Sequence, residues 1–136
     1  MLTSHITYLG GLRTEAVHLQ SGEKIITDAP TDNHGKGQAF SPTDLLATSL
    51  GTCILTTIGI VAAREGMTPI DGAEASVTKV MYNDPRRVGE IIVKIIFPAR
   101  NFSAKEKIMY ERTAHTCPVA KSLHPELKEV LEFEWK

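Results

Sequence analysis

The longest hydrophobic stretch of the chain, residues 45–63, contains no charged side chain. Ser41 and Asp44 before it form an S-x-x-D capping box, and Pro42 falls at the first helical position, where its missing N–H costs nothing. Gly66 after it suits a left-handed C-cap. The pattern therefore predicts a helix from Ser41 to Gly66. Because this helix is apolar on nearly every side, we expect it to be buried on nearly every side.

The rest of the chain alternates between apolar and polar positions, which is typical of half-buried strands. Ser103 and Glu106 form a second capping box, which predicts a helix through about Thr116, before Pro118 interrupts it. The expected strands are residues 2–9, 12–20, 24–28, 73–82, 88–97 and 129–135. The strand at 88–97 is β-branched enough to be covered on both faces. The predicted order is βββ-α-ββ-α-β, an α+β fold in a single domain of residues 1–136.

The central helix is too long for this number of strands to cover. At ~1.5 Å per residue, twenty-five residues would span about 37 Å, roughly the width of a small domain. Two copies of the helix that bury each other would remove the mismatch, so we expect a homodimer. The uncharged run is also long enough for a membrane span. Its five hydroxyl side chains and two glycines favour a buried helix of a soluble protein instead.

Composition excludes several classes of partner. The net charge is −1 and there is no block of basic residues, which argues against a nucleic acid or an anionic membrane surface. The N-terminal residues alternate and lack the apolar core of a signal peptide, so we expect a cytoplasmic protein. In a reducing compartment, a pair of cysteines is more often catalytic or metal-binding than structural.

The two cysteines have different settings. Cys53 lies near the middle of the central helix, where a free cysteine often serves only as a small hydrophobic residue. Cys117 precedes a proline, which predicts an N-cap for a short helix over residues 119–123. The helix dipole there would favour a thiolate, and His115 and Lys121 could add positive charge. The alternative is a surface cysteine that happens to precede a proline.

Two motifs together resemble the OsmC/Ohr superfamily of osmotically inducible and organic hydroperoxide resistance proteins. They are S-P-T-D-L-L-A-T-S-L-G-T-C at residues 41–53 and H-T-C-P-V-A-K-S-L at residues 115–123. The likeness is greatest to the OsmC-like branch with a C-P-V motif at the second cysteine, and it covers essentially the whole chain. It implies a thiol peroxidase in which two chains intertwine around paired central helices.

The resemblance also implies roles for both cysteines. Cys53 would be the peroxidatic cysteine and Cys117 the resolving cysteine, joined in a disulfide after each turnover. An external dithiol or thiol would reduce the pair, and neither a metal nor an organic cofactor would be needed. The apolar neighbours Leu50, Ile54 and Leu55 suit an organic hydroperoxide better than hydrogen peroxide.

An arginine from the N-terminal strands and a glutamate at the start of the central helix assist catalysis in this family. Arg13 is the candidate here, being the first arginine and the only one before the central helix. The glutamate position holds Thr43, followed by Asp44, which the capping box already explains. Threonine cannot hold an arginine by charge, so the sequence leaves the Arg13 clamp in doubt. Thr43, Asp44 and His115 are retained only as supporting candidates.

Two other interpretations remain open. His115 and His124 with the two cysteines could form a zinc site, although the spacing matches no standard zinc motif. His5, His18 and His34 fit strand and loop positions without assigned chemistry. A non-catalytic binder of an apolar small molecule, held in the groove of the dimer, is the alternative from another functional class.

Overall fold

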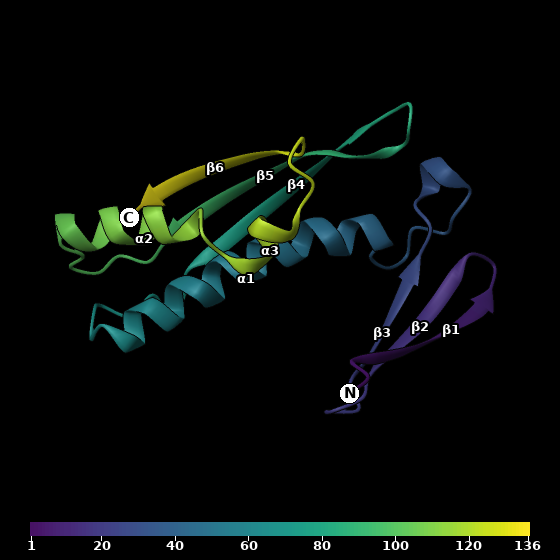
Figure 1. Ribbon diagram of the computed structural model, residues 1–136, viewed down its shortest axis with the longest axis horizontal. Helices are drawn as coiled ribbons and strands as arrows, with labels where there is room; N and C mark the ends of the chain where they lie inside the picture. Colours follow the sequence, from purple (N-terminus) through teal and green to yellow (C-terminus); the bar gives the residue numbers. More distant parts are fainter. The chain divides into compact units, whose positions relative to one another are not determined.

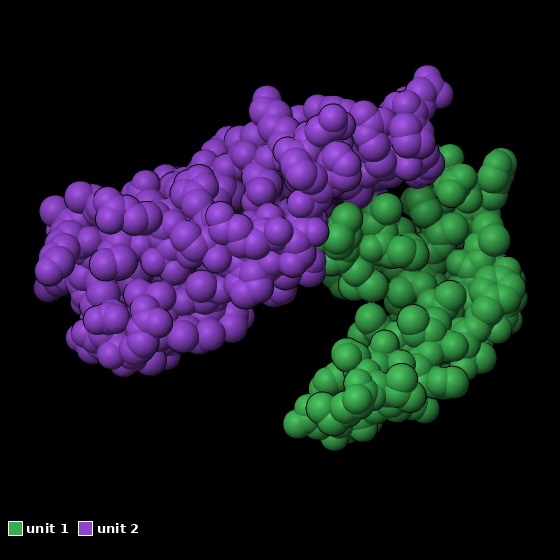
Figure 2. All heavy atoms as spheres, in the orientation of Figure 1, with its two compact units in different colours: residues 1–46 green, residues 47–136 purple.

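The computed structural model describes residues 1–136 and divides into two compact units, residues 1–46 and residues 47–136 (Figure 2). The predicted α+β class and the predicted order of strands and long helices are confirmed. A short 3₁₀ turn at Thr31–Asn33 and a short third helix complete the chain. We call residues 1–46 the first unit and residues 47–136 the second unit.

The first unit is a three-stranded antiparallel sheet in the order β1-β2-β3 (Figure 1). Its strands are β1 (Ser4–Gly10), β2 (Arg13–His18) and β3 (Lys24–Asp28). The turn between β1 and β2 needs left-handed backbone, and Gly10 and Gly11 supply it with φ values of +85° and +60°. The predicted hairpin is therefore present, with its strands starting and ending within about two residues of the expected positions.

Helix α1 (Pro42–Arg64) begins and ends where the sequence predicts. At its start the Asp44 N–H donates to Ser41 Oγ at 3.0 Å, and the Ser41 N–H donates to Asp44 Oδ2 at 2.9 Å. At its end Gly66 has a φ of +63°, and the Met67 N–H donates to the Ala62 carbonyl at 2.9 Å. These bonds are those of a capping box and of a glycine C-cap.

The second unit contains a mixed sheet in the order β4-β5-β6. Strand β5 (Arg87–Phe97) is central, antiparallel to β4 (Glu74–Tyr82) and parallel to β6 (Lys128–Trp135). The expectation that β5 is covered on both faces is wrong within one chain. Burial alternates along the strand. One face packs into the core while the other stays half-buried. The fully buried side chains of β5 are Ile91, Val93, Ile95 and Phe97.

Helices α1, α2 (Ala104–Ala114) and α3 (Pro118–Ser122) contribute with the sheet to one core (Figure 1). The Ser103 capping box of α2 forms as predicted, with both reciprocal hydrogen bonds present. The fully buried side chains that α1, α2 and the start of α3 give to this core are Leu50, Ile54, Ile58, Tyr110, Ala114 and Cys117. The core therefore joins the middle of α1 to the segment that carries the second cysteine.

Burial of α1 within one chain is one-sided, and this departs from the expected burial on nearly every side. Only 39% of its most apolar 18-residue window is buried, while Leu46 and Ile60 are 41% and 57% exposed. The reason is that one sheet can cover only one side of a helix. By length and composition alone α1 could cross a membrane, since the mean hydropathy of its most apolar 18-residue window is 1.9. Buried core helices of soluble proteins can be equally long and apolar.

Candidate functional site

Cys53 lies on α1 at the boundary between the buried and the exposed sides of the helix. Its side chain is half-buried and packs against the core of the second unit. Its sulfur is 3.9 Å from Thr57 Oγ1, one helical turn further along. Leu50 and Ile54 beside it are fully buried. The Cys53 thiol therefore has an apolar, partly accessible environment.

Cys117 is fully buried and is the N-cap of α3, as the sequence predicts. The Ala120 N–H donates to Cys117 Sγ at 3.4 Å. The proline at the first position of α3 accounts for this geometry, because it starts the helix without needing a hydrogen-bond partner. The alternative of a surface cysteine at this position is wrong.

The structure brings the two cysteines together. Burial raises the pKa of the Cys117 thiol above its ordinary value, a hydrogen bond with the Cys53 side chain acts in the same direction, and the Ala120 N–H opposes the shift. The expected preference of Cys117 for the thiolate is thus wrong, because desolvation disfavours the charged form more than the short α3 favours it. Both cysteines are free thiols. A buried neutral thiol therefore lies beside a half-buried one.

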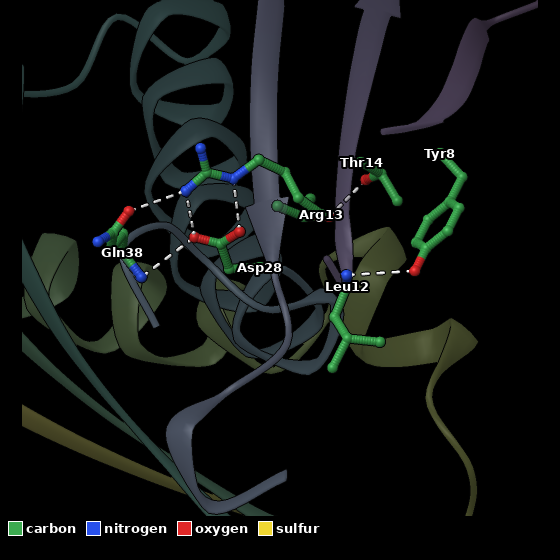
Figure 3. Close-up of polar contacts among 7 residues, drawn as sticks. Tyr8, Leu12, Arg13, Thr14, Asp28 and Gln38 are labelled. Atoms are coloured by element: carbon green, nitrogen blue, oxygen red, sulfur yellow. Dashed lines mark hydrogen bonds and ion pairs between the residues drawn. The ribbon is translucent and has the colours of Figure 1, made fainter. Parts of the chain in front are cut away.

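Arg13, at the start of β2 in the first unit, is held by a carboxylate that the sequence did not reveal. Its Nε donates to Asp28 Oδ1 at 2.7 Å and its Nη2 to Asp28 Oδ2 at 2.9 Å, which is a two-point ion pair (Figure 3). The Asp28 side chain is fully buried, whereas that of Arg13 is 28% exposed. The hydrogen bonds from Arg13 hold the pKa of the Asp28 carboxyl below its usual range.

Gln38, in the loop before α1, completes this arrangement in the first unit. Its Oε1 accepts from Arg13 Nη2 at 3.0 Å, and its backbone N–H donates to Asp28 Oδ2 at 3.1 Å (Figure 3). The positive charge of Lys36 also lowers the pKa of Asp28. The signal for Asp28 lies in strand pairing, because Arg13 and Asp28 are direct partners across β2 and β3. A correct register assigned to the hairpin would have found it.

The supporting candidates have mainly structural surroundings. Asp44 closes the capping box of α1, and Thr43 Oγ1 lies 3.2 Å from Ser41 Oγ. His115 is exposed, with its ring 6.3 Å from that of Phe133 in an edge-on arrangement.

No group of three or more histidine, cysteine, aspartate or glutamate side chains suited to a metal ion is present. A hollow of about 350 Å³ is lined by α2 side chains and contains neither cysteine. It is formed by Lys105, Ile108, Met109 and Arg112.

Several solved structures share this fold. A candidate osmotic stress induced and detoxification response protein from Psychrobacter arcticus 273-4 is 54% identical, with a TM-score of 0.92 over 98% of this chain and 96% of that one. The organic hydroperoxide resistance protein OsmC from Legionella pneumophila is 18% identical, with a TM-score of 0.75 over 98% of both chains. A candidate organic hydroperoxide resistance protein from Vibrio cholerae, with captopril in one of its active sites, is 14% identical, with a TM-score of 0.69 over 98% of this chain and 92% of that one.

A comparison with curated proteins finds no match. The family model described as OsmC-like protein matches residues 35–131, which include α1, both cysteines and most of the second unit. The resemblance of the two cysteine motifs and the fold both agree with this match. The chain belongs to the OsmC-like protein family.

Proposed function

We propose that the protein is a thiol-dependent peroxidase that reduces organic hydroperoxides. The observation that carries the proposal is the proximity of the half-buried Cys53 and the buried Cys117, two free thiols whose side chains lie close enough to interact. Membership of the OsmC-like family, and relatives named for hydroperoxide resistance and detoxification, support a redox role in stress defence. The finer assignment of a two-cysteine mechanism rests on the environments of the two sulfurs.

The environments of the two thiols support different roles. Cys53 is the more accessible, so it is the sulfur that a hydroperoxide meets first. Cys117 is fully buried, and its raised pKa keeps it protonated until a partner sulfur is oxidised. Protection of Cys117 from direct attack fits a resolving cysteine, which must react with the other cysteine and not with the substrate.

The proposed reaction has two steps. The Cys53 thiolate attacks one oxygen of the hydroperoxide, the O–O bond breaks, and the alkoxide takes a proton and leaves as the alcohol. Cys53 is then a sulfenic acid. The Cys117 sulfur attacks the Cys53 sulfur, the S–O bond breaks, and the oxygen leaves as water with the proton of the Cys117 thiol. An external dithiol or thiol returns two electrons and two protons, as the reducing cytoplasm would allow.

The surroundings of Cys53 favour an organic substrate. Leu50 and Ile54 are fully buried beside it and Leu55 packs on the same core. They make the environment of Cys53 apolar, and such an environment provides no hydrogen bonds to the second oxygen of hydrogen peroxide. No metal or organic cofactor is part of the proposed chemistry.

We also propose that the working form is a homodimer in which the exposed side of α1 packs on a second copy of the chain. Leu46 and Ile60 are the large apolar residues on that side, and no charged residue occurs between them. Ile60→Asp should shift the protein toward monomer in sedimentation analysis. Ile108→Asp, on an isoleucine of α2 that is 60% exposed, is the matched control and should leave the oligomer intact. A monomeric wild-type protein would contradict the dimer.

Turnover measurements on two cysteine variants test the proposed function. Reduced protein with excess dithiothreitol should consume cumene hydroperoxide, and Cys53→Ser should abolish consumption. With excess hydroperoxide but no reductant, Cys117→Ser should release one equivalent of alcohol as the Cys53 sulfenic acid forms. A second hydroperoxide should then convert it to the sulfinic acid, with release of a second equivalent of alcohol. Glu74→Gln, a change at an exposed residue of β4 outside α1, should behave as wild type. Full activity of Cys53→Ser would contradict the assigned roles. An inactive wild-type protein would favour the non-catalytic binder.

A further inference from the structure

We propose that Thr57 is a further catalytic residue, whose hydroxyl donates a hydrogen bond to the Cys53 thiolate and stabilises it. The inference deepens the proposed function and rests on it, because the thiolate is the form of Cys53 that would attack the hydroperoxide. Both residues lie on α1 within the second unit, so their relative placement is fixed by a single helix.

The position of Thr57 follows from the period of the helix. It lies four residues after Cys53, and helical side chains lean back over the preceding turn, so the two side chains meet on one face. Thr57 Oγ1 is 3.9 Å from Cys53 Sγ, and both side chains are half-buried. Branching at Cβ restricts the rotation of a threonine side chain in a helix. The hydroxyl is therefore held near the sulfur at little entropic cost.

Other hydroxyls on the helices bond to the backbone instead. Thr52 Oγ1 donates to the carbonyl three residues earlier at 3.1 Å, and Thr113 Oγ1 on α2 donates to the carbonyl four residues earlier at 2.8 Å. Such back-bonding is the usual role of a hydroxyl inside a helix. The Thr57 hydroxyl has the Cys53 sulfur as its hydrogen-bond partner. Its proton is therefore available to the sulfur.

The second unit offers a negative charge on Cys53 little other support. Leu50 and Ile54 beside it are apolar and fully buried. The titratable neighbour is Cys117, and the charge of Glu129 on β6 acts on Cys117 in the direction that keeps it protonated. A hydroxyl stabilises a thiolate more than a neutral thiol, and charge-assisted hydrogen bonds are shorter and stronger than neutral ones. The contact with Thr57 should therefore tighten when Cys53 ionises.

The pH profile of Cys53 alkylation tests this role. Iodoacetamide rates are compared over a range of pH in a Cys117→Ser background, where Cys53 is the only cysteine. Thr57→Val removes the donor, so the midpoint of the profile should move to higher pH and the rate at pH 7 should fall about 3–10-fold. At a pH that ionises the thiol fully, the variant should react at least as fast as its parent, because a more basic thiolate is the better nucleophile.

Three further variants keep the test decisive. Thr57→Ser keeps the hydroxyl and should move the midpoint back toward that of the parent. Thr78→Val makes the same substitution at an exposed residue of β4, outside α1, and should leave the profile unchanged. Thr57→Ala removes the hydroxyl without adding a methyl group, and it replaces Thr57→Val if that variant fails to fold. With Cys117 present, kcat/KM for cumene hydroperoxide at pH 7 should follow the same order.

The outcomes separate the inference from the proposed function. If the wild type turns over hydroperoxide but Thr57→Val keeps the parent's pH midpoint, the role of Thr57 is overturned and the peroxidase stands. If Thr57→Val is slower by the same factor at every pH, Thr57 affects only access to Cys53 and the inference fails. If the wild type turns over no hydroperoxide, the proposed function fails. The pH midpoint then decides alone whether Thr57 stabilises the thiolate, with a shift reversed by Thr57→Ser supporting it and no shift overturning it.

Discussion

The hydroxyl of Tyr110 ties α2 to the turn after α1, and Tyr110→Phe should weaken the fold measurably. Tyr110 is fully buried, and its hydroxyl donates to the Thr68 carbonyl at 2.6 Å. Burial raises the pKa of the Tyr110 hydroxyl, which keeps it protonated as a donor. Because α2 leads directly into the Cys117 turn, this bond helps to fix the position of the second sulfur.

The expected cost follows from what the substitution leaves behind. Phenylalanine keeps the ring packing but leaves the carbonyl of the half-buried Thr68 without this donor, a penalty of about 1–3 kcal/mol in the free energy of unfolding. For a domain of this size, 2 kcal/mol is on the order of a 6 °C lower Tm. Urea denaturation followed by circular dichroism, at a fixed protein concentration, measures the change.

Tyr82→Phe is the matched control for this prediction. The Tyr82 ring is 39% exposed and its hydroxyl has no protein partner, so removing that oxygen should change the free energy of unfolding by less than about 0.5 kcal/mol. Equal stability of the two phenylalanine variants would refute the reasoning, because it would mean that the Thr68 bond contributes nothing.

Three further outcomes are expected from the same contacts. Hydrogen bonds from Arg13 lower the pKa of the Asp28 carboxyl, and hydrogen bonds from the backbone N–H groups of Thr68 and Ser103 lower that of Glu106. Both carboxylates therefore stabilise the fold above the ordinary carboxyl pKa of about 4, so urea midpoints should fall as the pH drops below this value; a flat acid profile would contradict the contribution of these hydrogen bonds. Burial raises the pKa of the Cys117 thiol, and this acts in the opposite sense. The contribution of the neutral thiol to the free energy of unfolding is complete below the ordinary thiol pKa of about 8.5 and is lost as the pH rises above it. The urea midpoint of Cys117→Ser should therefore fall less at alkaline pH than that of the wild type. Gly35→Ala would place a Cβ 1.7 Å from the Ala29 carbonyl oxygen, so it should lower the free energy of unfolding by at least about 1–3 kcal/mol, and an unchanged urea midpoint would refute the close packing of this loop.

The helix ends that carry local capping motifs were predicted well from the sequence. The capping box at Ser41, the glycine C-cap at Gly66 and the capping box at Ser103 each involve residues no more than a few positions apart. The capping interactions involve only residues close together in the sequence, so the helix boundaries could be predicted without knowing the fold. The N-cap role of Cys117 was predictable for the same reason.

The features that the sequence did not reveal depend on contacts between distant residues. Asp28 pairs with Arg13 only through the register of the β2–β3 hairpin, so this ion pair could not be predicted from the neighbouring residues in the sequence. The preference of Cys117 for the neutral thiol comes from burial under the core, which outweighs the local effect of the helix terminus. The one-sided burial of α1 likewise follows from how many elements are available to cover it.

Disulfide mapping after a single oxidation tests the central claim most directly. Fully reduced protein is treated with one equivalent of cumene hydroperoxide, quenched with an alkylating agent, and digested for mass spectrometry. Both free thiols should disappear together, and one pair of peptides should be joined through Cys53 and Cys117 within a single chain. Two alkylated cysteines with the hydroperoxide left unconsumed would contradict it.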